Sequence, residues 1–192
     1  MNEKKEKLEA LTADVPEEEK PVVFYSAGMG DSLLGTLAGG SIVDQWVTTA
    51  GGRLATKDVT LTENDEITAE ELFNINPDII MVGGSFQQKL LMELKESDEW
   101  KDLKAVTDGK VYNSPYGCYN WDRFGMESLL ELDYAFMCFY PELAAENGIT
   151  EESMVKEVID FYQYFNGKEM TEEEASNMLA GLLYDGRAEN LE

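Results

Sequence analysis

The segment from Tyr116 to Arg123 carries the side chains best suited to binding a small molecule. Aromatic rings on a loop can stack on a planar or apolar ligand, and Arg123 can fork onto a carboxylate or a catecholate-like anion. The phenol oxygens of Tyr116 and Tyr119 could coordinate ferric iron. Tyr119 and Trp121 could equally form the lid of the core beneath the next helix. We expect Tyr119, Trp121 or Arg123 to contact a ligand.

Few residues are suited to catalysis. The chain contains no histidine, which excludes Ser-His-Asp and Cys-His mechanisms and every histidine-containing metal site. Ser26 and Ser85 stand just past predicted strands, but neither lies in a G-x-S-x-G turn. We therefore expect a binding protein and no enzyme. Cys118 and Cys138 lie outside any C-x-x-C motif, so two unpaired thiols are favoured slightly over a disulfide.

Three glycines after the first predicted strand leave a nucleotide-binding enzyme domain open as an alternative. Gly28, Gly30 and Gly35 precede a predicted helix, as in a phosphate-binding loop. However, a dinucleotide fingerprint needs glycine where Leu33 stands, and a P-loop needs lysine where Thr36 stands. The glycines more simply allow a tight turn at the carboxyl end of a strand. In open α/β sheets that edge is where ligands bind.

The charge of the chain restricts its partners. The 192 residues are 43% apolar, as in an ordinary globular domain, and carry a formal net charge of −24. Such an acidic surface repels nucleic acid and anionic lipid, so neither is an expected partner. Most of the charge is expected to be solvated surface. A domain that binds a basic partner protein is a further alternative function.

Apolar runs and helix signals predict an α/β domain with a mostly parallel central sheet, flanking helices and a helical C-terminal region. The predicted strands cover residues 22–25, 78–84 and 110–113, with a short extended segment over 53–59. The predicted helices cover residues 2–13, 42–50, 68–76, 87–94 and 125–140, followed by two that Thr150 and Thr171 cap. The aromatic stripe of Phe161, Tyr162, Tyr164 and Phe165 is expected to be core.

Several short motifs follow one another in a fixed order. They are residues 21–25 (PVVFY), 39–41 (GGS), 50–52 (AGG), 68–72 (TAEEL), 76–80 (NPDII), 100–106 (WKDLKAV), 109–112 (GKVY), 121–123 (WDR), 140–142 (YPE) and 161–165 (FYQYF). Each is weak alone. As an ordered set they resemble the C-terminal lobe of the periplasmic substrate-binding proteins that deliver iron–siderophore complexes, haem or cobalamin to ABC importers.

The resemblance implies one lobe of a two-lobed binding protein. Residues 1–20 would be the end of the inter-lobe helix and a linker, and residues 21–190 the C-terminal substrate-binding lobe. The loops 26–31, 83–87 and 116–123 would form its half of the cleft. The candidate ligand contacts in these loops are Ser26, Met29, Asp31, Ser85, Tyr116, Tyr119, Trp121 and Arg123. No intrinsic cofactor or metal is implied, and the ligand would be a ferric complex, haem or a corrinoid.

The resemblance also implies where such a protein works. The family acts outside the cytoplasm, often anchored as a lipoprotein, and docks on its permease through acidic residues. No apolar leader segment follows Met1, and the ends resemble engineered ones, because Leu191-Glu192 looks like a cloning remnant. The N-terminal lobe would be missing. We expect the exposed half-cleft to be apolar and to promote some self-association.

Overall fold

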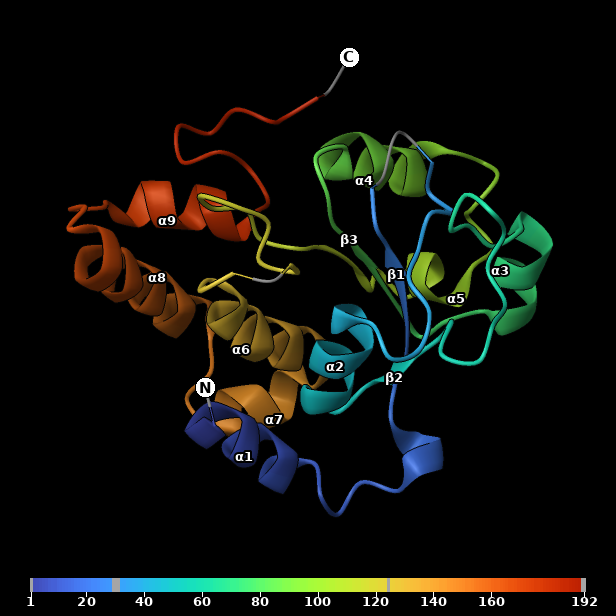
Figure 1. Cartoon of the computed structure of the whole chain (residues 1–192), viewed down its shortest axis with the longest axis horizontal. Helices are drawn as coiled ribbons and strands as arrows, with labels where there is room; N and C mark the ends of the chain where they lie inside the picture. Colours follow the sequence, from blue (N-terminus) through green and yellow to red (C-terminus); the bar gives the residue numbers. More distant parts are fainter. Residues whose placement is uncertain (1, 29–31, 124, 191–192) are drawn as a thin grey trace.

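The computed structural model describes residues 2–28, 32–123 and 125–190, and its centre is a four-stranded parallel sheet. The strands are β1 (Val22–Ser26), β2 (Arg53–Leu54), β3 (Ile79–Val82) and β4 (Val111–Asn113). They lie in the order β2-β1-β3-β4, and every neighbouring pair is parallel. Helices cover both faces of the sheet (Figure 1). This arrangement confirms the predicted α/β fold.

Alternate residues of the central strands face two separate hydrophobic cores, because successive side chains of a strand point to opposite faces. Phe24 and Ile80 point toward α3 (Ala69–Ile75), α4 (Gln87–Glu96) and α5 (Lys104–Thr107). Tyr25 and Met81 point to the opposite core, which contains the buried residues of the remaining helices. Those helices are α1 (Asn2–Leu11), α2 (Ile42–Thr49), α6 (Ser128–Phe139), α7 (Pro141–Glu146), α8 (Glu151–Asn166) and α9 (Glu172–Leu179). Burial on both faces explains why the strands read as continuous apolar runs.

The helix starts at Thr68, Thr150 and Thr171 lie where the sequence predicts them, whereas α6 begins at Ser128 and not near residue 125. Ser41 accepts a hydrogen bond from the Asp44 backbone N–H and caps α2. Thr68, Thr150 and Thr171 each form a reciprocal capping box at α3, α8 and α9. A 3-10 turn over Glu17–Glu19 lies in the acidic segment between α1 and β1. Among the described residues, no helix is both long and apolar enough to cross a membrane.

Some elements differ from those that the sequence predicts. The extended segment predicted over residues 53–59 is a strand only at Arg53–Leu54, because turns follow immediately. Pro141 ends α6, as predicted, but it also begins α7, since proline fits the first turn of a helix. The short helix α5 was not predicted; four residues are too few to show a helical period.

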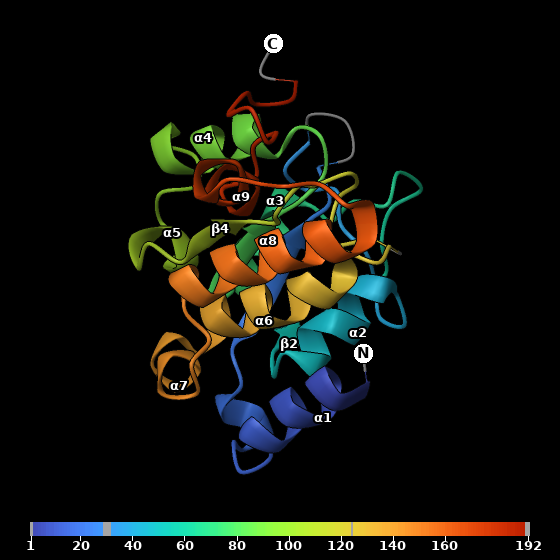
Figure 2. The ribbon, with the colours of Figure 1, turned by 90° about the vertical axis from the view of Figure 1, so that its left-hand side faces the viewer.

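The aromatic stripe of α8 is only partly core. Tyr162 is buried and Phe161 is partly buried, whereas Tyr164 is 81% exposed and Phe165 is 45% exposed. The buried face follows Met154, Val158 and Tyr162 at a spacing of four residues, which places Tyr164 on the opposite side of the helix. The prediction was therefore wrong for Tyr164 and Phe165. Figure 2 shows α8 lying outside α6, with its outer side uncovered.

Candidate functional site

The carboxyl ends of β1, β3 and β4 bring three loops together at one edge of the sheet. The Gly83 N–H donates to the Ser26 carbonyl at 2.8 Å, and the Ser114 N–H donates to the Val82 carbonyl at 2.7 Å. Arg123 Nη2 then reaches back across the edge to the Ala27 carbonyl at 3.3 Å. The loops expected to line a site therefore do converge, where open α/β sheets bind ligands.

Close contact between the first two loops depends on glycine. Gly28 has φ +54°, and a Cβ there would overlap the carbonyl oxygen of Gly83. The helix that follows this loop does not start at the glycines. α2 begins only at Ile42, and the hydroxyl of Ser41 caps it. Gly35 therefore lies well before the helix N-terminus, and the geometry of a phosphate-binding loop is not met.

A buried polar cluster lies directly behind this edge. The hydroxyl of Tyr25 donates a short hydrogen bond to Asp122 Oδ2, and both residues are fully buried. Asp122 Oδ1 faces Arg123 Nε at 3.4 Å. Burial raises the pKa of the Asp122 carboxyl, and Arg123 together with the Tyr25 hydrogen bond partly offsets that rise. Burial and the neighbouring Asp122 raise the pKa of Tyr25 well above its usual value, so Tyr25 stays a neutral donor.

Glu131 is a second carboxyl group buried close to the first. Its Oε2 accepts a hydrogen bond from the Ser114 hydroxyl at 3.3 Å, and its side chain is fully buried. Burial, and then the charge of Asp122, raise the pKa of Glu131 well above its usual value. Asp122 has the arginine beside it, and Glu131 has a hydroxyl. These neighbours favour an ionised Asp122 carboxylate beside a protonated Glu131 carboxyl.

Sequence reasoning did not identify Tyr25, Asp122 or Glu131. Tyr25 and Asp122 are 97 positions apart, so only the fold brings them together. Glu131 had a local signal, because it lies inside a helix whose other residues are largely apolar and buried. An acidic residue at a core position is rare unless it has a role or a partner.

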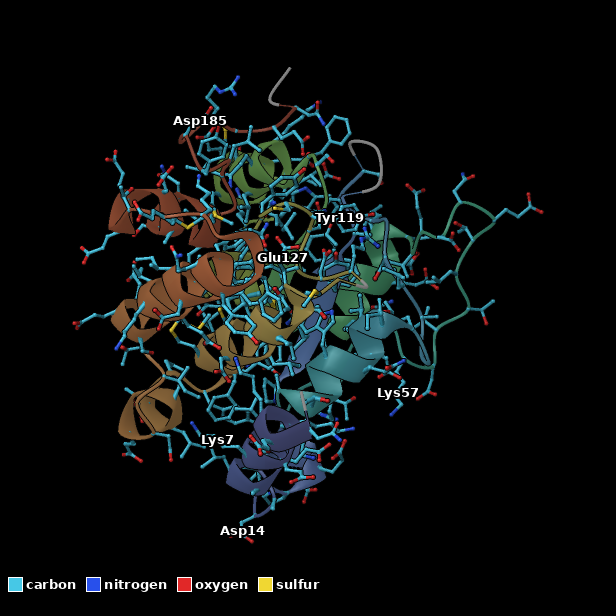
Figure 3. All side chains as sticks on the ribbon, turned by 60° about the vertical axis from the view of Figure 1, so that its left-hand side comes forward. Lys7, Asp14, Lys57, Tyr119, Glu127 and Asp185 are labelled. Atoms are coloured by element: carbon cyan, nitrogen blue, oxygen red, sulfur yellow. The ribbon has the colours of Figure 1, made fainter. Side chains whose placement is uncertain are left out.

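The aromatic residues predicted to contact a ligand differ in burial within the third loop, residues 116–123. Trp121 is fully buried in the core, whereas Tyr119 is 56% exposed. Figure 3 labels Tyr119 and, close to it in this view, Glu127. Tyr116 is partly buried and pairs with Asn120 in an isolated bridge. Glu127 holds the third loop in place, because its Oε1 accepts a hydrogen bond from the Cys118 N–H at 2.7 Å. Contact of Tyr119 or Arg123 with a ligand stays a prediction. Trp121 is a core residue in this structure.

The remaining candidates lie as follows. Ser26 is fully buried, and Ser85 is partly exposed at the start of the second loop. Met29 and Asp31 lie outside the described residues. Within the described part of the chain, no cluster of three or more acidic or cysteine residues could hold a metal ion.

Residues 1–116 match the family described as periplasmic binding protein. The chain belongs to this family. The resemblance inferred from the short motifs is thereby confirmed.

The two cysteines are free thiols, with Cys118 exposed and Cys138 buried.

Solved solute-binding proteins share the fold over nearly the whole chain. An ABC transporter solute binding protein from Sulfurospirillum deleyianum DSM 6946 superposes with a TM-score of 0.75 at 27% identity, covering 92% of this chain and 52% of that one. The molybdate periplasmic binding protein MolA of Haemophilus influenzae gives 0.70 at 20% identity, covering 88% and 49%. This chain spans about half the length of these relatives. The Fe(3+)-citrate-binding protein YfmC of Bacillus subtilis (strain 168) is 36% identical over 59 residues, 31% of this chain and 18% of YfmC.

Proposed function

We propose that the chain forms the C-terminal lobe of an extracytoplasmic solute-binding protein that captures an iron complex for an ABC importer. The observation that carries the proposal is the convergence of three loops at the carboxyl edge of a parallel sheet, in a member of the periplasmic binding protein family. The lobe would perform no chemistry. A second lobe would close over the ligand and remove it from water.

Within the site, the two outward-facing groups have different tasks. Tyr119 offers an exposed ring for stacking, and Arg123 offers a forked donor for a carboxylate or catecholate. Burial, and then Glu189, raise the pKa of Tyr116, so Tyr116 is a poor source of phenolate oxygen for iron. An iron complex is favoured over haem or a corrinoid by these polar contacts and by the likeness to YfmC.

The permease partner would meet the acidic surface of this lobe. A formal charge of −24 supports docking onto a basic surface of the importer. Such docking weakens as salt rises, because charges beyond a Debye length of about 8 Å are screened at physiological ionic strength. The affinity for the importer in vesicles should therefore fall steadily with added salt.

Thermal unfolding with a panel of ligands tests the proposed function. The panel contains ferric citrate, a ferric siderophore, haem, cobalamin, metal-free citrate, ATP and NAD. Ligand at a hundredfold excess over its Kd stabilises the folded chain by about 2.7 kcal/mol. We expect a rise in Tm with a ferric complex, and a smaller rise in Tyr119→Ala and Arg123→Ala.

Lys110→Ala is the matched control, since Lys110 precedes β4 at the opposite edge of the sheet and is exposed. It should respond to the ferric complex as the unaltered chain does. A rise in Tm with ATP or NAD and with no iron or tetrapyrrole complex would contradict the proposal and favour a nucleotide-binding domain.

A further inference from the structure

Arg123 joins the first and third loops at the edge of the sheet. Its Nη2 donates to the Ala27 carbonyl at 3.3 Å, in the loop after β1. Its Nε faces the Oδ1 of Asp122 at 3.4 Å. A guanidinium group has five N–H donors in a fixed fork, and the described contacts engage two of its nitrogens. The side chain keeps 23% of its surface exposed, so part of it can be reached by a ligand.

The carboxylate of Asp122 is held in place on both of its oxygen atoms. Its side chain is fully buried, and its second oxygen accepts the hydrogen bond of Tyr25. Tyr25 itself belongs to the central strand β1, and its ring meets Trp46 edge-on with centroids 5.7 Å apart. The carboxylate is therefore anchored to the buried central strand, away from water that would weaken its attraction for Arg123.

Gly83 makes room for this pair. A Cβ at Gly83 would overlap both Asp122 Oδ2 and the hydroxyl oxygen of Tyr25. The second loop is thus in contact with the same cluster that fixes the third loop. The second and third loops therefore both contact the Tyr25–Asp122 hydrogen bond.

We propose that Asp122, held by the Tyr25 hydroxyl, is a positioning residue that fixes the Arg123 guanidinium at the edge of the sheet to receive an anionic group of the ligand. The anionic ligand rests on the proposed function. The positioning rests on the contacts alone, and it can be measured without a ligand.

The test uses the side-chain Nε–H signals of the arginines in nitrogen-15 NMR spectra of the whole chain. There are three arginines, and Arg123→Lys identifies the signal of Arg123 by its loss. Arg53 Nε donates to the Lys20 carbonyl and Arg187 Nε donates to Asp185, so both provide internal references. In Asp122→Asn, we expect the Arg123 signal to shift and its hydrogen exchange to accelerate about tenfold or more, as the ion pair with Asp122 is lost.

Two further variants separate positioning from general disruption. Tyr25→Phe keeps the carboxylate but removes its hydrogen bond, and should shift the Arg123 signal in the same direction by less. Glu131→Gln removes a neighbouring buried carboxyl with no arginine contact among the described residues, and should leave the signal unchanged. If Asp122→Asn and Tyr25→Phe leave the Arg123 signal unchanged, or Glu131→Gln moves it as far as Asp122→Asn does, the positioning role is wrong.

Metal-free citrate then probes the anion. Citrate should shift the Arg123 signal in the unaltered chain and in Glu131→Gln, and Asp122→Asn should need about tenfold more citrate for the same shift. Equal citrate responses in Asp122→Asn and the unaltered chain, or no response of Arg123 in the unaltered chain, would overturn the proposal. If a ferric complex stabilises the chain but does not shift the Arg123 Nε–H signal, the positioning inference is wrong and the proposed function stands. A fixed Arg123 that responds to citrate, without stabilisation by any ferric complex, would refute only the iron assignment.

Discussion

At the scale of single residues, the buried carboxyl of Glu131 sets a pH dependence of stability. Its folded-state pKa is raised by burial, so the folded chain holds a proton that the unfolded chain releases above a pKa of about 4.3. The stabilising effect of that proton is complete below this pH and is lost as pH rises through the raised folded-state pKa. The chain should therefore lose stability from this group as the solution becomes neutral and then basic.

Glu131→Gln should remove this loss. Glutamine is neutral at all these pH values and can still accept the hydrogen bond of Ser114. We expect the variant to gain about 1 kcal/mol or more over the unaltered chain at about pH 8, and little at about pH 4. Urea unfolding at a series of pH values measures the difference. Parallel pH profiles of the two proteins would show that Glu131 is not protonated in the folded state.

Gly83 gives a second prediction at this scale. Gly83→Ala should destabilise the chain by about 1–3 kcal/mol, because the added methyl group displaces Asp122 or Tyr25. Gly125→Ala is the control, since the nearest atom to a Cβ there is Glu127 Oε2 at 3.9 Å. Urea midpoints of both variants give the comparison. Equal midpoints for the two variants would mean that the cluster tolerates the methyl group.

The sequence suggested Tyr119 and Arg123 as candidate ligand contacts, but it did not suggest the buried residues that hold Arg123 in place. Arg123 and Tyr119 could be selected because arginine and aromatic residues on a loop after a strand have recognisable chemistry. The partnership of Tyr25 with Asp122 could not, since each looks ordinary until the fold brings β1 and the third loop together. The burial of Trp121 was likewise undetermined, because a tryptophan suits both a ligand surface and a core.

At the scale of elements, the helix caps were predictable because each is a local arrangement of four residues. Thr68→Ala should cost about 1 kcal/mol, since it removes the side-chain acceptor for the Glu71 N–H and the partner of the Glu71 carboxylate. Thr60→Ala, at an exposed loop position, is the control and should change stability by less than about 0.5 kcal/mol. Chemical unfolding of both variants measures the difference. A loss in Thr60→Ala as large as that in Thr68→Ala would contradict the capping role.

The strands were also predictable, whereas the outer face of α8 was not. Apolar runs bounded by glycine or proline suffice for a strand covered on both faces. An aromatic stripe at helical spacing shows which residues share a face, but it does not show whether another element covers that face. α8 contacts α6 and α9, and Tyr164 and Phe165 at its outer end stay exposed.

At the scale of the whole molecule, exposed apolar side chains gather near the third loop. Tyr119, Met126, Tyr164 and Phe165 are each at least 45% exposed. The end of α8 touches this loop, because Asn166 Nδ2 lies 3.6 Å from Cys118 Sγ. Exposed apolar side chains that form a common surface mark an interaction site in soluble proteins.

We therefore expect the isolated chain to self-associate through this surface. The weight-average mass measured by light scattering should rise with protein concentration, and Tyr119→Ser combined with Phe165→Ser should suppress the rise. Met92→Ser is the matched control, since Met92 is 51% exposed but lies on α4, which packs on the opposite core. Its mass should follow that of the unaltered chain. The net charge of −24 opposes association, so added salt should strengthen it by screening the repulsion. A constant monomer mass at high concentration and high salt would show that these side chains are too dispersed to form an interface.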